Sequence, residues 1–205
     1  MADITTWSTW SELVAPATLT MGTTQGRYVW DLTSKLAGVL RINMALLGTT
    51  VPGAAIDIRV TRIAGSTDGA ADSVSPAIIW AMAYRPTGTV ASTTINGDVA
   101  AGEDHLHVAS TTNFAQGDKI VVTDASFDRI EFHELVGTGS GLLYLLNRTV
   151  YAHTAAQGDT VYDNAGAWDL YIPGGSIVAI VADYRGASTG SNVVWQVLGQ
   201  TEDYA

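Results

Sequence analysis

Histidine is the residue of this chain best suited to metal or proton chemistry, and all four copies lie in one segment in its middle. His105 and His107 are two positions apart and would share one face of a strand, as would Glu131 and His133. Imidazoles and carboxylates gathered in this way can bind zinc or nickel. The spacing matches no established ligand motif, so we favour polar strand faces that carry these residues, with His153 closing a turn. We therefore expect no metal ion and no cofactor.

Acidic residues in the same segment offer a second kind of chemistry, the paired acid and base of a glycosidase. The candidates are Asp124, Asp128, Glu131 and Glu134. Nothing in the sequence marks a substrate cleft, so a solvated acidic loop is the favoured interpretation. There is no Gly-x-Ser-x-Gly motif for a nucleophile, and the glycine-rich residues 137–141 lack the lysine of a phosphate-binding loop and are predicted to form a hairpin turn. We expect no enzymatic activity.

Aromatic residues suggest contacts with other subunits. Trp7 and Trp10 lie in a segment with little regular pattern, which is predicted to be either a short helical turn or an extended arm. Exposed aromatics in such a segment would dock well on a neighbouring subunit. Trp80 and Trp195 fall within predicted strands and are expected in a core. A sugar-binding platform is the alternative, but the aromatics have no regular spacing to support it.

A near-duplicated turn shows how the elements that carry these residues are arranged. Residues 114–120 read FAQGDKI and residues 155–161 read AAQGDTV. Each copy places Gly-Asp directly before an apolar run, which is typical of a turn that enters a strand. Asp118 and Asp159 are accordingly interpreted as turn formers and not as catalysts.

The strand pattern predicts an all-β chain made of two parts. Residues 1–89 and 165–205 are expected to form a split, jelly-roll-like β-sandwich host domain with an N-terminal arm, and residues 90–164 an inserted small β-rich module. Host strands are predicted at residues 39–47, 56–63, 77–84, 176–184 and 192–198. Module strands are predicted at residues 105–108, 119–123, 129–136, 142–146 and 160–162.

Composition excludes several classes of partner. Lysine and arginine total 10 against 20 acidic residues, for a net charge of −10, which disfavours a surface for binding nucleic acid. There is no cysteine, so neither disulfides nor thiolate metal sites are available. No apolar run approaches the roughly 20 residues of a membrane span, and the first residues do not resemble a signal peptide. We expect neither nucleic acid nor a membrane as partner.

Several of these segments resemble structural proteins of tailed-bacteriophage virions. The module carries VASTTNFAQGD at residues 108–118 and RTVYAH at residues 148–153, which are similar to modules common in such proteins. The host carries LYIPGGS at residues 170–176 and a short acidic tail, and is similar to phage proteins that bind on the capsid. The resemblance implies a cement or decoration protein that is mostly β, often trimeric and without catalytic residues. Few lysines and many glycines agree with rigid, repeated assembly.

The expected function is therefore that of a capsid cement protein, made in the host cytoplasm and located on the virion surface. Its partners would be the major capsid protein and copies of itself, in a homotrimer. By binding only the assembled head it would stabilise that state by mass action. The expected contact residues are Trp7, Trp10 and Tyr28, with Arg27 and Arg41 pairing with capsid carboxylates.

Three alternatives remain open from the sequence. One is a tail or fibre-linked virion component, which would form rings or elongated assemblies. A second is a carbohydrate-binding module or glycan hydrolase, with Trp168 and the region of Asp128 and Glu131 as its site. A third is a metal-dependent protein.

Overall fold

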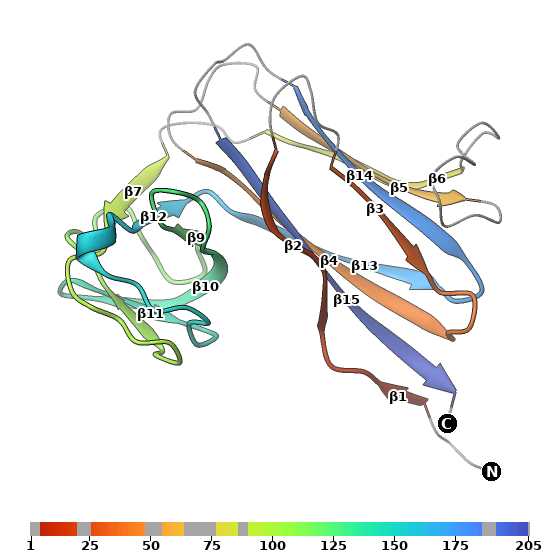
Figure 1. Cartoon of the computed structure of the whole chain (residues 1–205), viewed down its shortest axis with the longest axis horizontal. Coiled ribbons are helices and arrows are strands. Elements are labelled where there is room, and N and C mark those ends of the chain that lie inside the picture. The colour runs from red at the N-terminus through yellow and green to blue at the C-terminus, as the bar shows by residue number, and fades with distance from the viewer. Residues whose placement is uncertain are drawn as a thin grey trace.

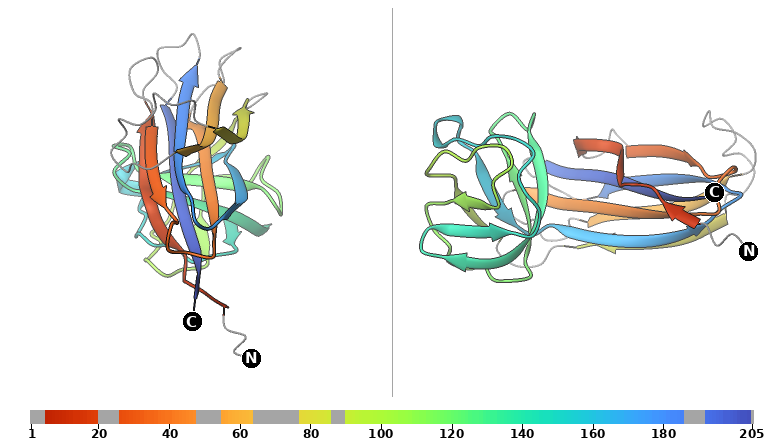
Figure 2. Two further views of the ribbon diagram at one scale, coloured as in Figure 1. Left: turned by 90° about the vertical axis from the view of Figure 1, so that its right-hand side faces the viewer. Right: turned by 90° about the horizontal axis from the view of Figure 1, so that it is seen from below.

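The computed structural model describes residues 5–19, 26–47, 55–63, 77–85, 90–185 and 192–204. These residues form three antiparallel sheets, which confirms the all-β prediction (Figure 1). Two of the sheets pack face to face as a sandwich, and the third belongs to the module at one end of the molecule, as Figure 2 also shows. No helix in the described ranges has the length and apolarity needed to span a bilayer.

The sandwich consists of a five-stranded and a four-stranded sheet. The first contains β1 (Thr5–Trp7), β2 (Ser11–Leu19), β4 (Ala37–Leu47), β13 (Gly166–Pro173) and β15 (Asn192–Tyr204), in the order β1-β15-β4-β13 with β2 also on β15. The second contains β3 (Gly26–Asp31), β14 (Ile177–Arg185), β5 (Ala55–Ile63) and β6 (Ala77–Tyr84), in the order β3-β14-β5-β6. Alternate residues of these strands point inward and form a core of aliphatic side chains and two tryptophans, Trp30 and Trp195.

The host strands pair as if the chain were one long hairpin. β2 pairs with β15, β3 with β14, β4 with β13 and β5 with β6, all antiparallel. From β2 onward, every connection between consecutive host strands except that from β5 to β6 crosses from one sheet to the other. The sandwich is therefore a single hairpin folded over into two layers, and its earliest strands contact its last ones.

The module sheet has six strands in the order β7-β12-β9-β10-β11-β8. They are β7 (Ala91–Thr94), β8 (His105–His107), β9 (Lys119–Thr123), β10 (Ile130–Gly139), β11 (Leu142–Leu145) and β12 (Thr160–Asp163). The sheet curls, because Ile95 forms a bridge with Val108 and so joins its two edges. It encloses a second apolar core, which includes Leu106, Ile120 and Leu143.

The duplicated turns have the local geometry that their sequence predicted. Gly117 and Gly158 both have positive φ angles, 91° and 69°, which residues with a Cβ rarely adopt. Asp118 Oδ2 accepts a hydrogen bond from the Ala115 N–H at 2.6 Å, as a turn former does. The second copy contains a short 3₁₀ helix, η2 (Ala155–Gln157), and its aspartate has a different environment, described below.

Several local predictions were incomplete or wrong. Of the two alternatives predicted for the segment after Trp7, the extended one is found, and the segment leads into strand β2. The acidic tail is the end of β15, which pairs with β1 of the same chain. The N-terminal arm is thus part of its own sheet as far as it is described. Residues 137–139 belong to β10 and not to a turn, so the hairpin bends only at Ser140 and Gly141.

Candidate functional site

The module is docked on the outer face of the five-stranded sheet by a third apolar cluster. Ala45, Leu47 and Val194 come from the sandwich, and Val121 and Ile130 from the module. All are buried, and partly buried aromatic side chains of the module surround them. The crossing segments reinforce this contact: the Asn164 amide donates to the Leu46 carbonyl, and the Tyr84 hydroxyl donates to the Asn164 carbonyl. The two parts therefore form a packed junction.

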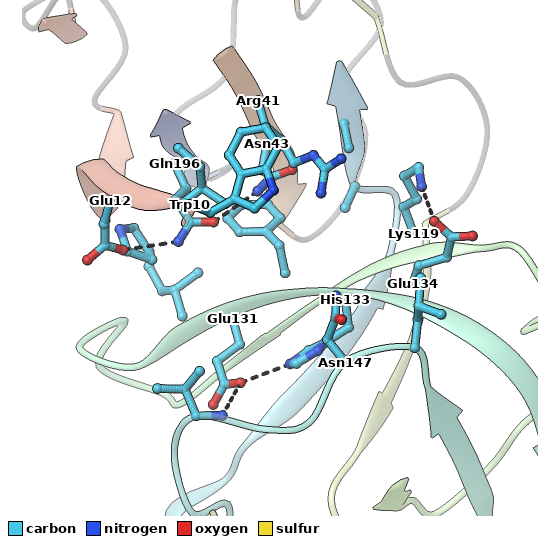
Figure 3. Close-up of a pocket in the computed structure, with 18 of the residues that line it drawn as sticks. Trp10, Glu12, Arg41, Asn43, Lys119, Glu131, His133, Glu134, Asn147 and Gln196 are labelled. Atoms are coloured by element: carbon cyan, nitrogen blue, oxygen red, sulfur yellow. Dashed lines mark hydrogen bonds and ion pairs between the residues drawn. The ribbon is translucent and has the colours of Figure 1, made fainter. Parts of the chain in front are cut away.

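Beside this cluster a cleft of about 600 Å³ opens between the sheet and the module (Figure 3). The sandwich contributes Trp10, Glu12, Arg41, Asn43, Asp169 and Gln196. The module contributes Lys119, His133, Glu134, Asn147, Val150 and Tyr151. Its volume and its convergent polar groups, contributed by both parts of the chain, make this cleft the candidate functional site.

Strand register builds the sandwich wall of the cleft. Asn43 lies opposite Gln196, and its amide donates to Gln196 Oε1 at 2.9 Å. The Gln196 amide in turn donates to Glu12 Oε1 at 3.0 Å. Two positions along β4, on the same face, Arg41 lies opposite Asp169 and donates two parallel hydrogen bonds of 2.7 Å to its carboxylate. The result is a row of mutually oriented polar side chains across four strands.

The residues predicted to contact partners are distributed unevenly. Trp7 and Trp10 are both exposed, 43% and 38%, and the Arg41 guanidinium lies 4.8 Å from the centre of the Trp10 ring. Tyr28 packs against the sandwich core. Arg41 already pairs with Asp169 of its own chain, whose pKa that hydrogen bond lowers. Arg27 lies in β3, and its side chain is outside the described part of the structure.

Glu131 is the centre of the module wall. Its side chain is 4% exposed and accepts hydrogen bonds from the N–H groups of Val150 and Tyr151 at 2.8 and 2.5 Å. It also contacts the Nε2 atoms of His133 at 2.9 Å and of His153 at 3.2 Å. Glu131 thereby ties the segment after β11, which forms the rim of the cleft, to strand β10.

A second buried carboxylate extends the network below the cleft. Asp159 is fully buried and its Oδ2 lies 2.9 Å from His153 Nδ1. Arg129 reaches Asp159 Oδ1 at 3.3 Å and Asp124 Oδ2 at 3.5 Å, and donates to the Ala152 carbonyl at 2.6 Å. His153 is thus held between two carboxylates, with a guanidinium beside one of them.

The network shifts the titration of its members. Burial opposes ionisation of Glu131, but hydrogen bonds from His133, His153 and two backbone N–H groups outweigh it and lower its pKa to about 2. Burial likewise disfavours a charged His153, yet its hydrogen bonds to Glu131 and Asp159 prevail and raise its pKa. Near the junction, burial raises the pKa of Asp163 to about 6, with a further contribution from Asp118.

These contacts correct three interpretations made from sequence. Glu131 and Asp124 do not belong to a solvated acidic loop, because both are buried and hydrogen bonded. His153 does more than close a turn, and Asp159 is a buried ion-pair partner as well as a turn residue. No local signal marks this network, because its members come together only when β10, β12 and the segment after β11 assemble.

The other candidate residues from the sequence lie outside this network. Trp168 packs against the sandwich core and forms an edge-to-face contact with Tyr84, with ring centres 5.5 Å apart, so it is no open sugar platform. Glu134 pairs with Lys119 at 2.5 Å. The ligand atoms of Glu103, Asp104 and His105 lie within 4.8 Å of one another, and the His105 and His107 rings are 5.1 Å apart.

Comparison with known proteins adds little to this geometry. No family model matches the chain, and no curated protein matches it. Among solved structures it is similar to VP17, a capsid protein of bacteriophage P23-77, with 96% of this chain and 97% of that chain covered. The identity is 9% and the TM-score 0.22, values too low to indicate a shared function.

Proposed function

We propose that this chain is a structural virion protein of a tailed bacteriophage that binds the assembled head and stabilises it, with no enzymatic role. The observation that carries the proposal is the pairing of the host strands. An eight-stranded jelly roll is expected to have this connectivity, with four strand pairs distributed over two sheets. The pairs here are β2 with β15, β3 with β14, β4 with β13 and β5 with β6. Viral capsid domains commonly use that architecture. The sequence resemblance to phage capsid-binding proteins supports the same role independently of the fold.

Exposed apolar side chains at separate places support a bridging role. Leu146 and Val150, on the module, are 58% and 69% exposed, and Ile78 and Tyr171, on the sandwich, are 59% and 61% exposed. Ile78 lies on β6 and Tyr171 on β13, which are the outermost strands of their sheets among the described elements. Large exposed apolar side chains on outer strands are typical of contact surfaces between subunits. Two such surfaces on one chain allow it to join neighbouring subunits.

The packed junction between module and sandwich also fits this role. A protein that links two capsid subunits must hold its contact surfaces at a fixed separation, because slack would let the lattice move. The apolar cluster around Ala45, Val121 and Val194 provides that rigidity. We expect the major capsid protein and two further copies of this chain as partners, on the outer surface of the head.

Particles with and without the protein provide the test. Loss of the gene product should leave heads that assemble but break at lower temperature or lower salt, as seen by electron microscopy and by release of DNA. Purified protein should bind emptied heads and restore their stability, whereas V150S and Y171S should bind more weakly. A matched control is T138S, an exposed position on the module outside the apolar surfaces. Equal survival of particles with and without the protein would refute the proposal, and its presence in rings or fibres would favour a tail component.

A further inference from the structure

We propose that the cleft between the module and the five-stranded sheet is a binding site for a neutral oligosaccharide. The site borders one of the apolar surfaces assigned to capsid contacts, because Leu146 and Val150 lie on its module side. The inference does not depend on the proposed virion role. It rests on an unpartnered buried group in the cleft wall, on the ion pairs that hold Arg41 and Lys119, and on the aromatic side chains at the edges of the cleft.

His133 indicates that the cleft takes a ligand. Its side chain is 3% exposed and lies in the cleft wall, and its Nδ1 atom is buried with no hydrogen-bond partner. Unpartnered buried polar atoms are rare in native proteins and often mark a functional group. Since Glu131 is an ionised acceptor, it fixes the hydrogen of the His133 ring on Nε2. In the neutral ring Nδ1 then carries a lone pair to which no described group donates, and a hydroxyl group of the ligand would supply that hydrogen bond.

Two of the three cationic side chains that line the cleft are held in ion pairs, which favours a neutral ligand. Arg41 is held by Asp169 and Lys119 by Glu134, with distances of 2.7 and 2.5 Å. Glu12 accepts a hydrogen bond from Gln196. A phosphate or a charged peptide would have to displace a carboxylate from Arg41 or Lys119. The third cation, Arg148, donates to the Gly102 carbonyl. A neutral molecule rich in hydroxyl groups can bind the remaining lone pairs and N–H groups without breaking a pair.

The row of polar side chains suits vicinal hydroxyl groups. Planar amides and carboxylates present two adjacent donors or acceptors, and here Asn43, Gln196 and Glu12 lie side by side in an orientation fixed by their own hydrogen bonds. Such prior ordering reduces the entropy lost on binding. Asn147, on the opposite wall, adds another amide (Figure 3).

Aromatic rings border the cleft on both sides. Trp10 comes from the sandwich and Tyr151 from the module, and they are 38% and 39% exposed. Aromatic rings offer flat apolar faces against which the C–H face of a pyranose can pack, and each also carries a polar atom. The volume, about 600 Å³, falls within the usual range of small-ligand sites.

Glycan binding by the purified chain tests the proposal. The protein is screened on an array of neutral and acidic bacterial and animal oligosaccharides, and calorimetry measures affinity for the neutral oligosaccharide that binds best. W10A and Q196A should each weaken binding about tenfold or more, because they remove the ring and the central amide of the polar row. W7A is the matched control: it removes an exposed tryptophan of the same segment outside the cleft, and binding should stay within about twofold.

The possible outcomes separate the alternatives. Melting curves for all three variants show whether a loss of binding reflects a loss of folding. W10F keeps an aromatic ring and should bind more tightly than W10A. Absence of binding to every neutral oligosaccharide at millimolar concentration would overturn the proposal. Binding of acidic glycans alone, or binding that W10A and Q196A leave unchanged, would also overturn it. None of these results depends on whether the chain stabilises a phage head.

Discussion

The sandwich and the module solve the problem of a stable core in different ways. In the sandwich most buried residues are aliphatic or aromatic. Its few buried polar side chains, Asn43, Thr61 and Ser176, are uncharged. In the module an apolar core is accompanied by buried ionisable residues, namely Asp124, Glu131, His133, His153 and Asp159. All the buried ionisable side chains of the described ranges belong to the module.

Size explains this difference. A small module buries a smaller fraction of its surface than a large domain does, so apolar burial alone stabilises it less. The network compensates by tying loops to strands through hydrogen bonds, as Glu131 does for the backbone at Val150 and Tyr151. It also makes the module sensitive to the loss of a single partner, since an unpaired charge in a core is costly. The sandwich should not share that sensitivity or its dependence on pH.

The largest expected effect comes from removing the central charge of the network. E131Q should destabilise the module by about 3–5 kcal/mol, because two histidines and two backbone N–H groups lose their ionised acceptor. Hydrogen exchange should show faster opening of module amides than of sandwich amides. I58A, in the fully buried sandwich core, is the matched control and should cost about 2–5 kcal/mol there. Equal loosening of both parts by both variants would show that they unfold as one unit.

The second-largest effect is expected from pH, which should change the stability of the module more than that of the sandwich. The folded pKa of Glu131, about 2, lies below its ordinary 4.5, so its stabilisation of roughly 3 kcal/mol is present above pH 4.5 and is lost as the pH falls toward 2. The raised pKa of His153 has the opposite sign: its contribution is complete below pH 6.5 and is lost as the pH rises through the folded value. Denaturant titrations monitored at module amides should therefore show maximal stability between these limits. In E131Q the stability of the module should fall less steeply as the pH is lowered. An unchanged fall would show that other carboxylates cause the loss of stability in acid.

A smaller effect is expected at the junction. V194A shortens a fully buried side chain in the cluster that joins β15 to the module, and should cost about 1–3 kcal/mol. Hydrogen exchange should increase on both sides of the junction, in Val121 and Ile130 as well as in β4. If only sandwich amides respond, the two parts are less tightly coupled than their packing indicates.

The smallest effect is expected from an ion pair at the surface. D169N removes the carboxylate bound by Arg41, but both side chains are substantially exposed, 49% and 38%, so the change should cost less than about 1 kcal/mol. Thermal melting at low and high salt measures it, and salt should reduce the difference. A loss as large as that of E131Q would show that exposed and buried charges contribute equally to the stability of this chain.

Sequence patterns predicted the strands with clear alternation far better than the others. β5 and β9 appear where period-two patterns and turn residues place them, because those signals are local. β1 and β2 were missed: their residues alternate weakly, and their strand conformation depends on pairing with β15 at the far end of the chain. The last residues of β15 were missed for the same reason.

The site was harder to predict than the fold. A solvated and a buried glutamate look alike in sequence, so nothing near Glu131 indicates that His153 and the backbone at Val150 would reach it. The cleft has a wall from each part of the chain and exists only because the module docks on the sheet. The exposure of Trp7 and Trp10 could be predicted, since their segment offers little apolar pattern with which to bury them.

The pairing of early with late strands also governs the order in which the chain can fold during synthesis. β1 and β2 depend on β15, and the hydrogen bond from Ser11 to Gly199 spans 188 residues, so the five-stranded sheet cannot close until translation is almost complete. The module strands, by contrast, lie within 73 consecutive residues, from Ala91 to Asp163, and can assemble while the ribosome is still making β13 to β15. Until then the apolar faces of β4 to β6 have no complete second sheet to cover them, and that nascent half-sandwich is the stage most exposed to aggregation.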